Sequence, residues 1–186
     1  MIETLSADPV FFASFASALV FTGAVAGLLA GLLGVGGGIV IVPVLFLLFP
    51  LIGVENTVLM HLAVGTSLAT IIPTSIISAR SHHRRGGVDF DLLKSWSPLI
   101  FVGVLIGSYV GSVVKGEVLT LIFALVAIVV ALNMAFRKEG VTLADELPTG
   151  AIRHGLGLLV GSFSVVMGIG GGTLSVPILT VFNLIR

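Results

Sequence analysis

Long apolar runs without a charged side chain are the feature that most limits how this chain can fold. All nine Lys and Arg residues and all nine Asp and Glu residues lie in the terminal stretches or in short connectors. Runs of about 20 such residues have the length of membrane-spanning helices. The sequence therefore predicts an all-α fold, a polytopic transmembrane helical bundle. The expected segments are 11–33 continuing as 39–49, then 57–79, 96–114, 118–136 and 155–184.

Composition excludes several classes of function. Hydrophobic residues make up 56% of the chain and charged residues 10%, which is unlike a soluble globular domain. The formal net charge is zero and no large basic block occurs, so nucleic acid is not an expected partner. The chain has no Cys, and no predicted span carries an acidic residue or a metal-spaced pair. We therefore expect no enzyme activity, no cofactor and no metal site.

Two connectors carry most of the positive charge and predict the topology. Connector 80–94 and connector 137–153 contain seven basic residues, namely Arg80, Arg84, Arg85 and Lys94, and Arg137, Lys138 and Arg153. By the positive-inside rule, both connectors face the cytoplasm. We favour this topological interpretation over a lipid head-group site or a regulatory site. His82, His83 and His154 are expected to be solvated in these connectors.

The chain contains an internal repeat at an offset of 134 residues. The glycine-rich stretch 34–38 falls on 168–172, and Pro43 falls on Pro177. Gly23 and Gly27 fall on Gly157 and Gly161. Many transporters consist of two such repeats, with the substrate site where the broken helices of the two halves meet.

The second copy of the repeat is shorter than the first. The first repeat covers 1–136, with a broken helix at 11–49 and spans at 57–79, 96–114 and 118–136. A connector at 137–154 leads to 155–186, the start of the second repeat, which about 80 further residues would complete. We interpret this second repeat as truncated, or as completed by a partner chain. Parallel and inverted repeats both stay open, although about 39 helical residues in 11–49 would span roughly 58 Å, which slightly favours a chain that doubles back.

Four glycines within 34–38 disfavour a continuous helix, and we expect a break there and at 168–172. Broken backbone at membrane depth is tolerated only where it is buried in protein or lines a wet cavity. A helix restarting near Ile39 would direct its free N–H groups into that space, and such an end attracts anions. Close helix packing is the alternative interpretation. The candidate substrate-binding residues at the breaks are Gly36, Gly37, Gly38, Gly170, Gly171 and Gly172.

The second span carries hydroxyls on one face. Ser67, Thr70, Thr74 and Ser78 follow steps of three, four and four residues, beside an expected kink at Pro73. Such hydroxyls can replace part of the water shell of an anion. They can equally bond a carbonyl one turn back or a neighbouring helix.

Two further features of the spans have a functional and a structural interpretation. His61, in the first turns of the second span, is a candidate for proton coupling because imidazole titrates near neutral pH, or it lies at the membrane interface. Glycines recur at four-residue steps in two spans, and we interpret these stripes as packing seams. The stripes are Gly23, Gly27 and Gly31, and Gly103, Gly107 and Gly111.

Together these motifs resemble the sulfite exporter TauE/SafE family of membrane permeases. The resemblance rests on the GxGGG break, the following Pro43, the stretch Ala63-Val64-Gly65-Thr66-Ser67 in the second span, and the second glycine break after a basic loop. It covers nearly the whole chain. It implies transport of small sulfur-containing anions along a path formed by the glycine breaks and the second span, and it adds Thr66 and Ser67 to the candidate site. The counterpart of 63–67 in the second repeat is missing.

We therefore interpret the chain as a permease that exports a small sulfur-containing anion such as sulfite or a sulfonate. The anion would be held by backbone N–H groups and by the hydroxyls of Thr66, Ser67 and Thr70 near the paired breaks. The alternative is a non-transporting membrane scaffold or assembly subunit. The expected location is a bacterial-type plasma (inner) membrane, which the chain crosses several times. The expected partners are the lipid bilayer, the anion, and either further copies of the chain or a chain that completes the second repeat.

Overall fold

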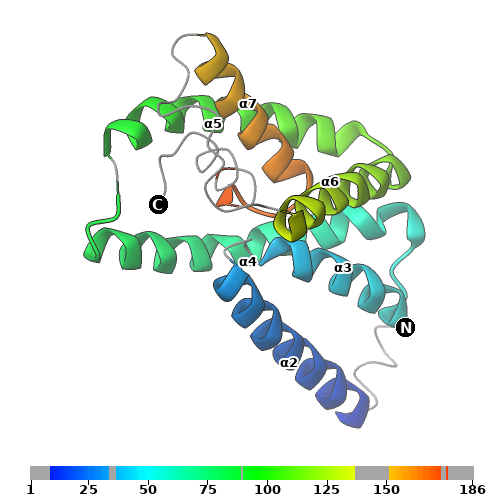
Figure 1. Cartoon of the computed structure of the whole chain (residues 1–186). Helices are drawn as coiled ribbons and strands as arrows, with labels where there is room; N and C mark the ends of the chain where they lie inside the picture. The colour runs from blue at the N-terminus through cyan, green and yellow to red at the C-terminus, as the bar shows by residue number, and fades with distance from the viewer. Residues whose placement is uncertain (1–8, 34–36, 89, 137–150, 173–174, 176–186) are drawn as a thin grey trace.

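The computed structural model describes residues 9–33, 37–88, 90–136, 151–172 and 175. Within these ranges the secondary structure is entirely helical (Figure 1). The elements are α2 (Pro9–Leu33), α3 (Gly38–Leu48), the 3-10 helix η1 (Phe49–Ile52), α4 (Asn56–Arg84), α5 (Phe90–Val113), α6 (Gly116–Phe136) and α7 (Ala151–Val166).

Charged residues lie at the helix ends where they oppose the helix dipole. Asp91 is in the first turn of α5 and Glu117 is in the first turn of α6. The last turn of α4 holds His82, His83 and Arg84. An acidic group near the N-terminus and a basic group near the C-terminus are each favourable by about 0.3–1 kcal/mol at an exposed position.

The helices are longer than the charge-free segments on which the expected spans were based. The second span, expected at 57–79, is Asn56–Arg84, and the third, expected at 96–114, is Phe90–Val113. Charged side chains end a charge-free segment, but they do not end a helix where they are exposed. The helical backbone therefore continues through the charged residues at the ends of α4 and α5. His82, His83 and His154, expected in connectors, therefore lie in the ends of α4 and α7.

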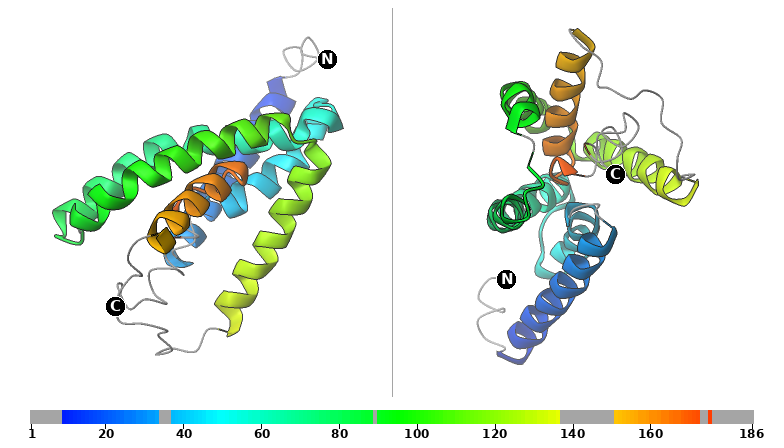
Figure 2. Two further views of the ribbon diagram at one scale, coloured as in Figure 1. Left: turned by 90° about the horizontal axis from the view of Figure 1, so that it is seen from above. Right: turned by 60° about the vertical axis from the view of Figure 1, so that its left-hand side comes forward.

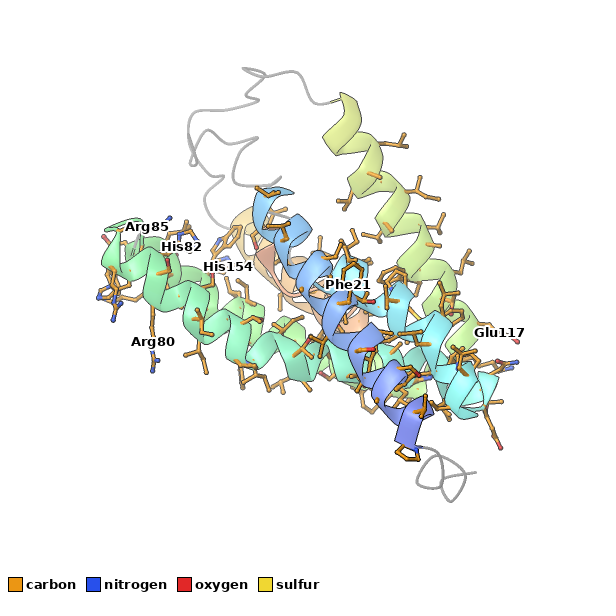
Figure 3. All side chains as sticks on the ribbon, turned by 90° about the horizontal axis from the view of Figure 1, so that it is seen from below. Phe21, Arg80, His82, Arg85, Glu117 and His154 are labelled. Carbon is orange, nitrogen blue, oxygen red and sulfur yellow. The ribbon has the colours of Figure 1, made fainter. Side chains whose placement is uncertain are left out.

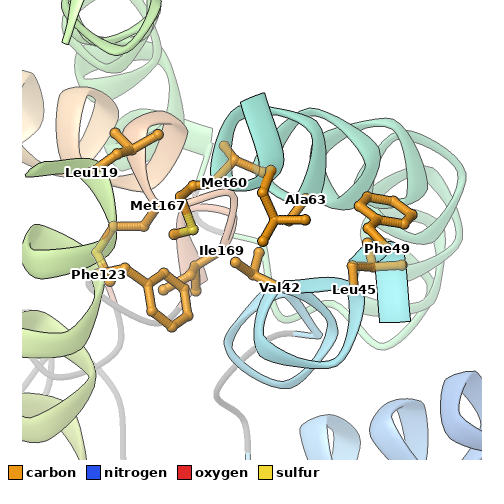
Figure 4. Packing of buried hydrophobic residues seen from close by; sticks show 11 residues of the cluster. Val42, Leu45, Phe49, Met60, Ala63, Leu119, Phe123, Met167 and Ile169 are labelled. Carbon is orange, nitrogen blue, oxygen red and sulfur yellow. The ribbon is translucent and has the colours of Figure 1, made fainter. Parts of the chain in front are cut away.

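One apolar cluster joins the middle of the fold. It contains residues of α3, η1, the first half of α4, α6 and the turn that follows α7 (Figure 4). Met167 and Ala63 at its centre are fully buried. The members are Val42, Leu45, Phe49, Leu59, Met60, Ala63, Val64, Leu119, Phe123, Met167 and Ile169. The cluster brings the segment after α7 against residues more than 100 positions earlier in the chain.

Helices α5 and α7 pack side by side through glycines (Figures 1 and 2). A Cβ added at Gly103 would overlap the carbonyl of Leu158, and one added at Gly107 would overlap that of Ser162. The Ser162 Oγ donates a hydrogen bond of 3.0 Å to the carbonyl oxygen of Gly103. The glycine stripe of α5 is therefore a packing seam, as the sequence predicts.

The glycine stripe of α2 behaves differently. A Cβ at Gly23, Gly27 or Gly31 would meet no atom within 4 Å. Helix α2 projects from the other described helices (Figure 2), and residues near its middle, such as Leu19 and Ala26, approach α3 and α4. The predicted seam on α2 thus has no partner among the described residues.

Large apolar side chains cover much of the outer surface. On α2, Val20, Phe21 and Leu32 are each more than 70% exposed, and Phe21 points outward (Figure 3). Two of the described helices, α4 and α5, are long and apolar enough to cross a bilayer, and only 17% of the most apolar window of each is buried. In water this surface would oppose folding, whereas in lipid it is the expected exterior.

The two ends of the helical assembly differ in charge. Arg80, His82, Arg85 and His154 lie at one end, and Glu117 lies at the opposite end (Figure 3). Of the basic residues that the sequence groups in connector 80–94, Arg80, Arg84 and Arg85 thus lie at the C-terminal end of α4, whereas Lys94 lies in α5.

Candidate functional site

The first glycine stretch, the second glycine stretch and α4 meet at one point in the structure. A Cβ added at Gly38, the first residue of α3, would overlap the carbonyl oxygen of Gly168 and the Cα of Ile169. The Oγ of Ser67 on α4 donates a buried hydrogen bond of 2.6 Å to the same Gly168 oxygen. We call this contact of Gly38, Ser67 and Gly168 the glycine junction. It brings Gly38 and Ser67 of the predicted site together with Gly168, which belongs to the predicted second break but not to the candidate binding residues.

The turn after α7 takes a shape that glycine makes possible. The N–H groups of Gly168 and Ile169 bond back to the carbonyls of Val165 and Ser164 at 3.1 Å each. Gly168 has a φ of +64° and Gly170 a φ of +77°, in the region that other residues rarely adopt. At Gly168 an added Cβ would also lie 3.0 Å from the Val64 oxygen of α4. Both backbone conformation and space therefore require glycine at this position.

The predicted hydroxyls of α4 differ in their partners, because Thr70 and Thr74 bond within the helix whereas Ser67 bonds Gly168. The Thr70 Oγ1 donates to the Ser67 carbonyl at 2.7 Å, and Thr74 donates to the carbonyls of Thr70 and Ile71. The hydroxyls of Thr70 and Thr74 thus bond carbonyls of their own helix, which is the alternative to anion binding given above. The half-buried Thr66 hydroxyl has no partner among the described residues and lines a cavity.

Two cavities lie on either side of α4. One, of about 270 Å³, lies between α2, α3 and α4, and its hydroxyl-bearing walls are Thr22, Thr66 and Thr70. The other, of about 210 Å³, lies between α4, α5, α6 and α7, and its lining includes His61, Gly65, Ser108 and Ser112. Neither cavity is lined by Lys, Arg, Asp or Glu. Both are large enough for a small hydrated anion.

His61 joins α4 to the end of α5. Its Nε2 lies 3.0 Å from the Val114 carbonyl oxygen, and its ring is partly buried. This contact requires that Nε2 carries a proton, because the carbonyl only accepts. The imidazole therefore holds two helix ends together and also lines the 210 Å³ cavity.

The remaining predicted glycines have less crowded surroundings, although Gly170 has a positive φ. Gly36 lies outside the described residues. A Cβ at Gly37 would meet the flexible end of Ile41 at 3.2 Å, and one at Gly171 would meet the Ser175 Oγ at 3.7 Å. Gly172 has nothing within 4 Å, and Gly170 faces Ile71. The structure thus brings Gly38 to the glycine junction, whereas Gly172 has no close contact among the described residues.

Sequence reasoning missed several polar groups near these cavities. Ser108 and Ser112 line the cavity of His61, and the buried Ser164 Oγ has no hydrogen-bond partner among the described residues. Ser108 directly follows Gly107, and Ser112 directly follows Gly111. The glycine stripe itself could therefore have indicated both serines. Ser164 carried no comparable signal.

The helical fold, its apolar exterior and its two membrane-length helices define an integral membrane protein. The chain belongs to the sulfite exporter TauE/SafE family, whose model matches residues 19–185. The family is that of a sulfite exporter, and its relatives below are named probable membrane transporter proteins.

Three relatives show the extent of the similarity. A protein of Haemophilus influenzae named "Probable membrane transporter protein" is 39% identical over 160 residues, covering 85% of this chain and 60% of the relative. "Probable membrane transporter protein YunE" of Bacillus subtilis is 30% identical over 182 residues, covering 86% and 65%. A relative in Methanocaldococcus jannaschii with the same type of name is 29% identical, covering 87% and 60%. The chain thus matches 60% to 65% of the length of these relatives. No solved structure matches the chain.

Proposed function

We propose that this chain takes part in the export of a small sulfur-containing anion, such as sulfite or a sulfonate, across a bacterial-type inner membrane. The family is described as a sulfite exporter, which supports the substrate class. The observation that carries the proposal is the glycine junction. Gly38 and Gly168 approach too closely for a side chain at Gly38, and the Ser67 hydroxyl donates a hydrogen bond to the Gly168 carbonyl oxygen.

The proposed anion site lies in the cavity between α2, α3 and α4. The lining is mostly apolar, and the Thr66 hydroxyl, which has no partner among the described residues, is the group proposed to donate to an anion. The N-terminal end of α3, whose Ile41 lines the cavity, adds a partial positive charge. With no Lys or Arg in the lining, binding would be weak and selective for size. Weak binding suits a site that must also release its substrate.

The proposed architecture is a pair of repeats related by the offset of 134 residues. Helix α7 corresponds to 17–32 within α2, and each helix is followed by a glycine-rich stretch. In both copies a helical segment follows, beginning at Gly38 in the first and including Gly172 and Ser175 in the second. The meeting of the two stretches is the arrangement expected where broken helices of two repeats form a site.

The test is anion flux into proteoliposomes that hold the 186-residue chain. Sulfite, sulfate, thiosulfate and a simple sulfonate are compared with chloride in vesicles whose chains face both ways. Saturable flux of a sulfur-containing anion, in excess of chloride flux, is the expected result. A folded preparation without flux would favour the second function, a scaffold or assembly subunit, for which the apolar face of α2 without a described partner is the supporting observation.

A further inference from the structure

The basic end of α4 carries a surface hollow that the transport proposal does not use. The hollow has a volume of about 400 Å³ and is lined by Ile77, Arg80, Ser81, Arg84 and Arg85. Three of its five lining residues are arginines, and no described acidic side chain forms an ion pair with them. Three guanidinium groups concentrated around one hollow repel one another, so the arrangement favours an anionic ligand.

The ligand chemistry follows from the residue types. Guanidinium groups bind phosphate oxygens in a bidentate manner, and a hydroxyl such as that of Ser81 can donate a further bond. Arg80 and Arg84 are one helical turn apart, so both can reach a single phosphate group. The arginines therefore fit a phosphate monoanion better than a carboxylate, which offers fewer oxygens.

The position of the hollow distinguishes a lipid from a free phosphate. Helix α4 is one of the two described helices of membrane length, and Arg84 is its last residue, so the hollow lies where hydrocarbon gives way to head groups. Ile72 and Ile76 precede Arg80 at four-residue steps on the same helical stripe, and Ile77, in the hollow itself, is 67% exposed. The exposed isoleucines thus form an apolar strip on α4 that ends at the arginine-lined hollow.

We propose that this hollow binds an anionic phospholipid, with its phosphate between Arg80 and Arg84 and an acyl chain along Ile72, Ile76 and Ile77. A purely topological role for the arginines would not need a hollow between them. The bound lipid would anchor the end of α4 that leads into α5. This inference is independent of which anion the protein transports.

Native mass spectrometry of the full chain, purified in detergent, tests the proposal. The chain is titrated with phosphatidylglycerol, with phosphatidylcholine, and with inorganic phosphate. We expect phosphatidylglycerol to bind at least about tenfold more tightly than phosphatidylcholine, since each basic residue near the surface contributes about 1 kcal/mol. Equal binding of the two lipids, or displacement of phosphatidylglycerol by millimolar inorganic phosphate, would overturn the assignment to a lipid.

A pair of matched variants locates the site. The double variant Arg80→Gln/Arg84→Gln should lose about tenfold or more of its phosphatidylglycerol affinity. The double variant Lys94→Gln/Lys115→Gln removes the same charge outside the hollow and should change that affinity less than about twofold. Equal losses in both variants would show general charge attraction and refute a built site. If the arginine variant fails to fold, the lipid selectivity of the unmodified chain still decides the proposal.

Discussion

At the scale of single residues, Gly38 and Gly172 are similar in sequence context and different in surroundings. A Cβ at Gly38 would overlap backbone atoms of Gly168 and Ile169, whereas a Cβ at Gly172 would meet nothing within 4 Å. Gly38→Ala should therefore destabilise the fold by about 1–3 kcal/mol, because backbone on the opposite side cannot move aside easily. Gly172→Ala should change stability by less than about 0.5 kcal/mol. Thermal unfolding in detergent, followed by circular dichroism, measures both, and equal unfolding temperatures would contradict the glycine junction.

His61 makes a second residue-scale prediction. If this imidazole couples anion flux to protons, flux by the unmodified chain should vary between pH 5 and pH 8, where histidine side chains change charge. His61→Gln keeps a donor for the Val114 carbonyl and removes the imidazole, so its flux should lose that dependence. The exposed His154 supplies the control, since His154→Gln should retain the profile of the unmodified chain. An unchanged pH profile in His61→Gln would leave His61 as a structural link between α4 and α5.

At the scale of helices, the seam between α5 and α7 can be tested with two neighbouring glycines. A Cβ at Gly107 would overlap the Ser162 carbonyl, whereas one at Gly111 would make an ordinary contact of 3.9 Å with Val166. Gly107→Ala should therefore cost about 1–3 kcal/mol and Gly111→Ala close to nothing. The unfolding temperatures of the two variants give the comparison. A stable Gly107→Ala would show that the two helices do not pack at this distance.

The sequence predicts helices well here because the bilayer imposes a simple rule. Apolar runs of sufficient length must be helical, so the existence of α4 and α5 follows from the residues alone. Their ends do not, because residues such as Arg80 and Asp91 can extend a helix into the polar region while appearing to belong to a connector. The glycine stripes show the same limit, since identical spacing gives a packed seam on α5 and a face without a described partner on α2.

The candidate site shows which interactions lie beyond local patterns. The glycine stretches and the α4 hydroxyls could be singled out from their residue types, and the glycine junction joins Gly38, Ser67 and Gly168. The pattern could not assign the hydroxyls, because Thr70 bonds its own helix while Thr66, four residues earlier, faces a cavity. It also could not supply the contact of His61 with Val114, which depends on how α4 and α5 meet.

At the scale of the whole molecule, the charge difference between the two ends predicts the orientation in the membrane. The chain has no Cys, so single cysteines can be introduced as unique labels. His83→Cys, at the basic end of α4, should react with a membrane-impermeant maleimide only when the cytoplasmic side is accessible. Glu117→Cys, at the opposite end, should react from the other side (Figure 3). Labelling of both cysteines from one side would contradict the proposed topology.

The central claim is that an anion is held by hydroxyls beside the glycine junction, and two threonines of α4 test it directly. Thr66 lines the cavity with an unpartnered hydroxyl, whereas the Thr74 hydroxyl bonds its own helix. The measurement is sulfite flux by Thr66→Val and Thr74→Val in proteoliposomes, at matched protein content and unfolding temperature. Loss of a hydrogen bond to a charged ligand costs about 1.5–3 kcal/mol, so Thr66→Val should require about tenfold or more sulfite for half-maximal flux, and Thr74→Val should behave like the unmodified chain. Equal behaviour of the two variants would contradict the account.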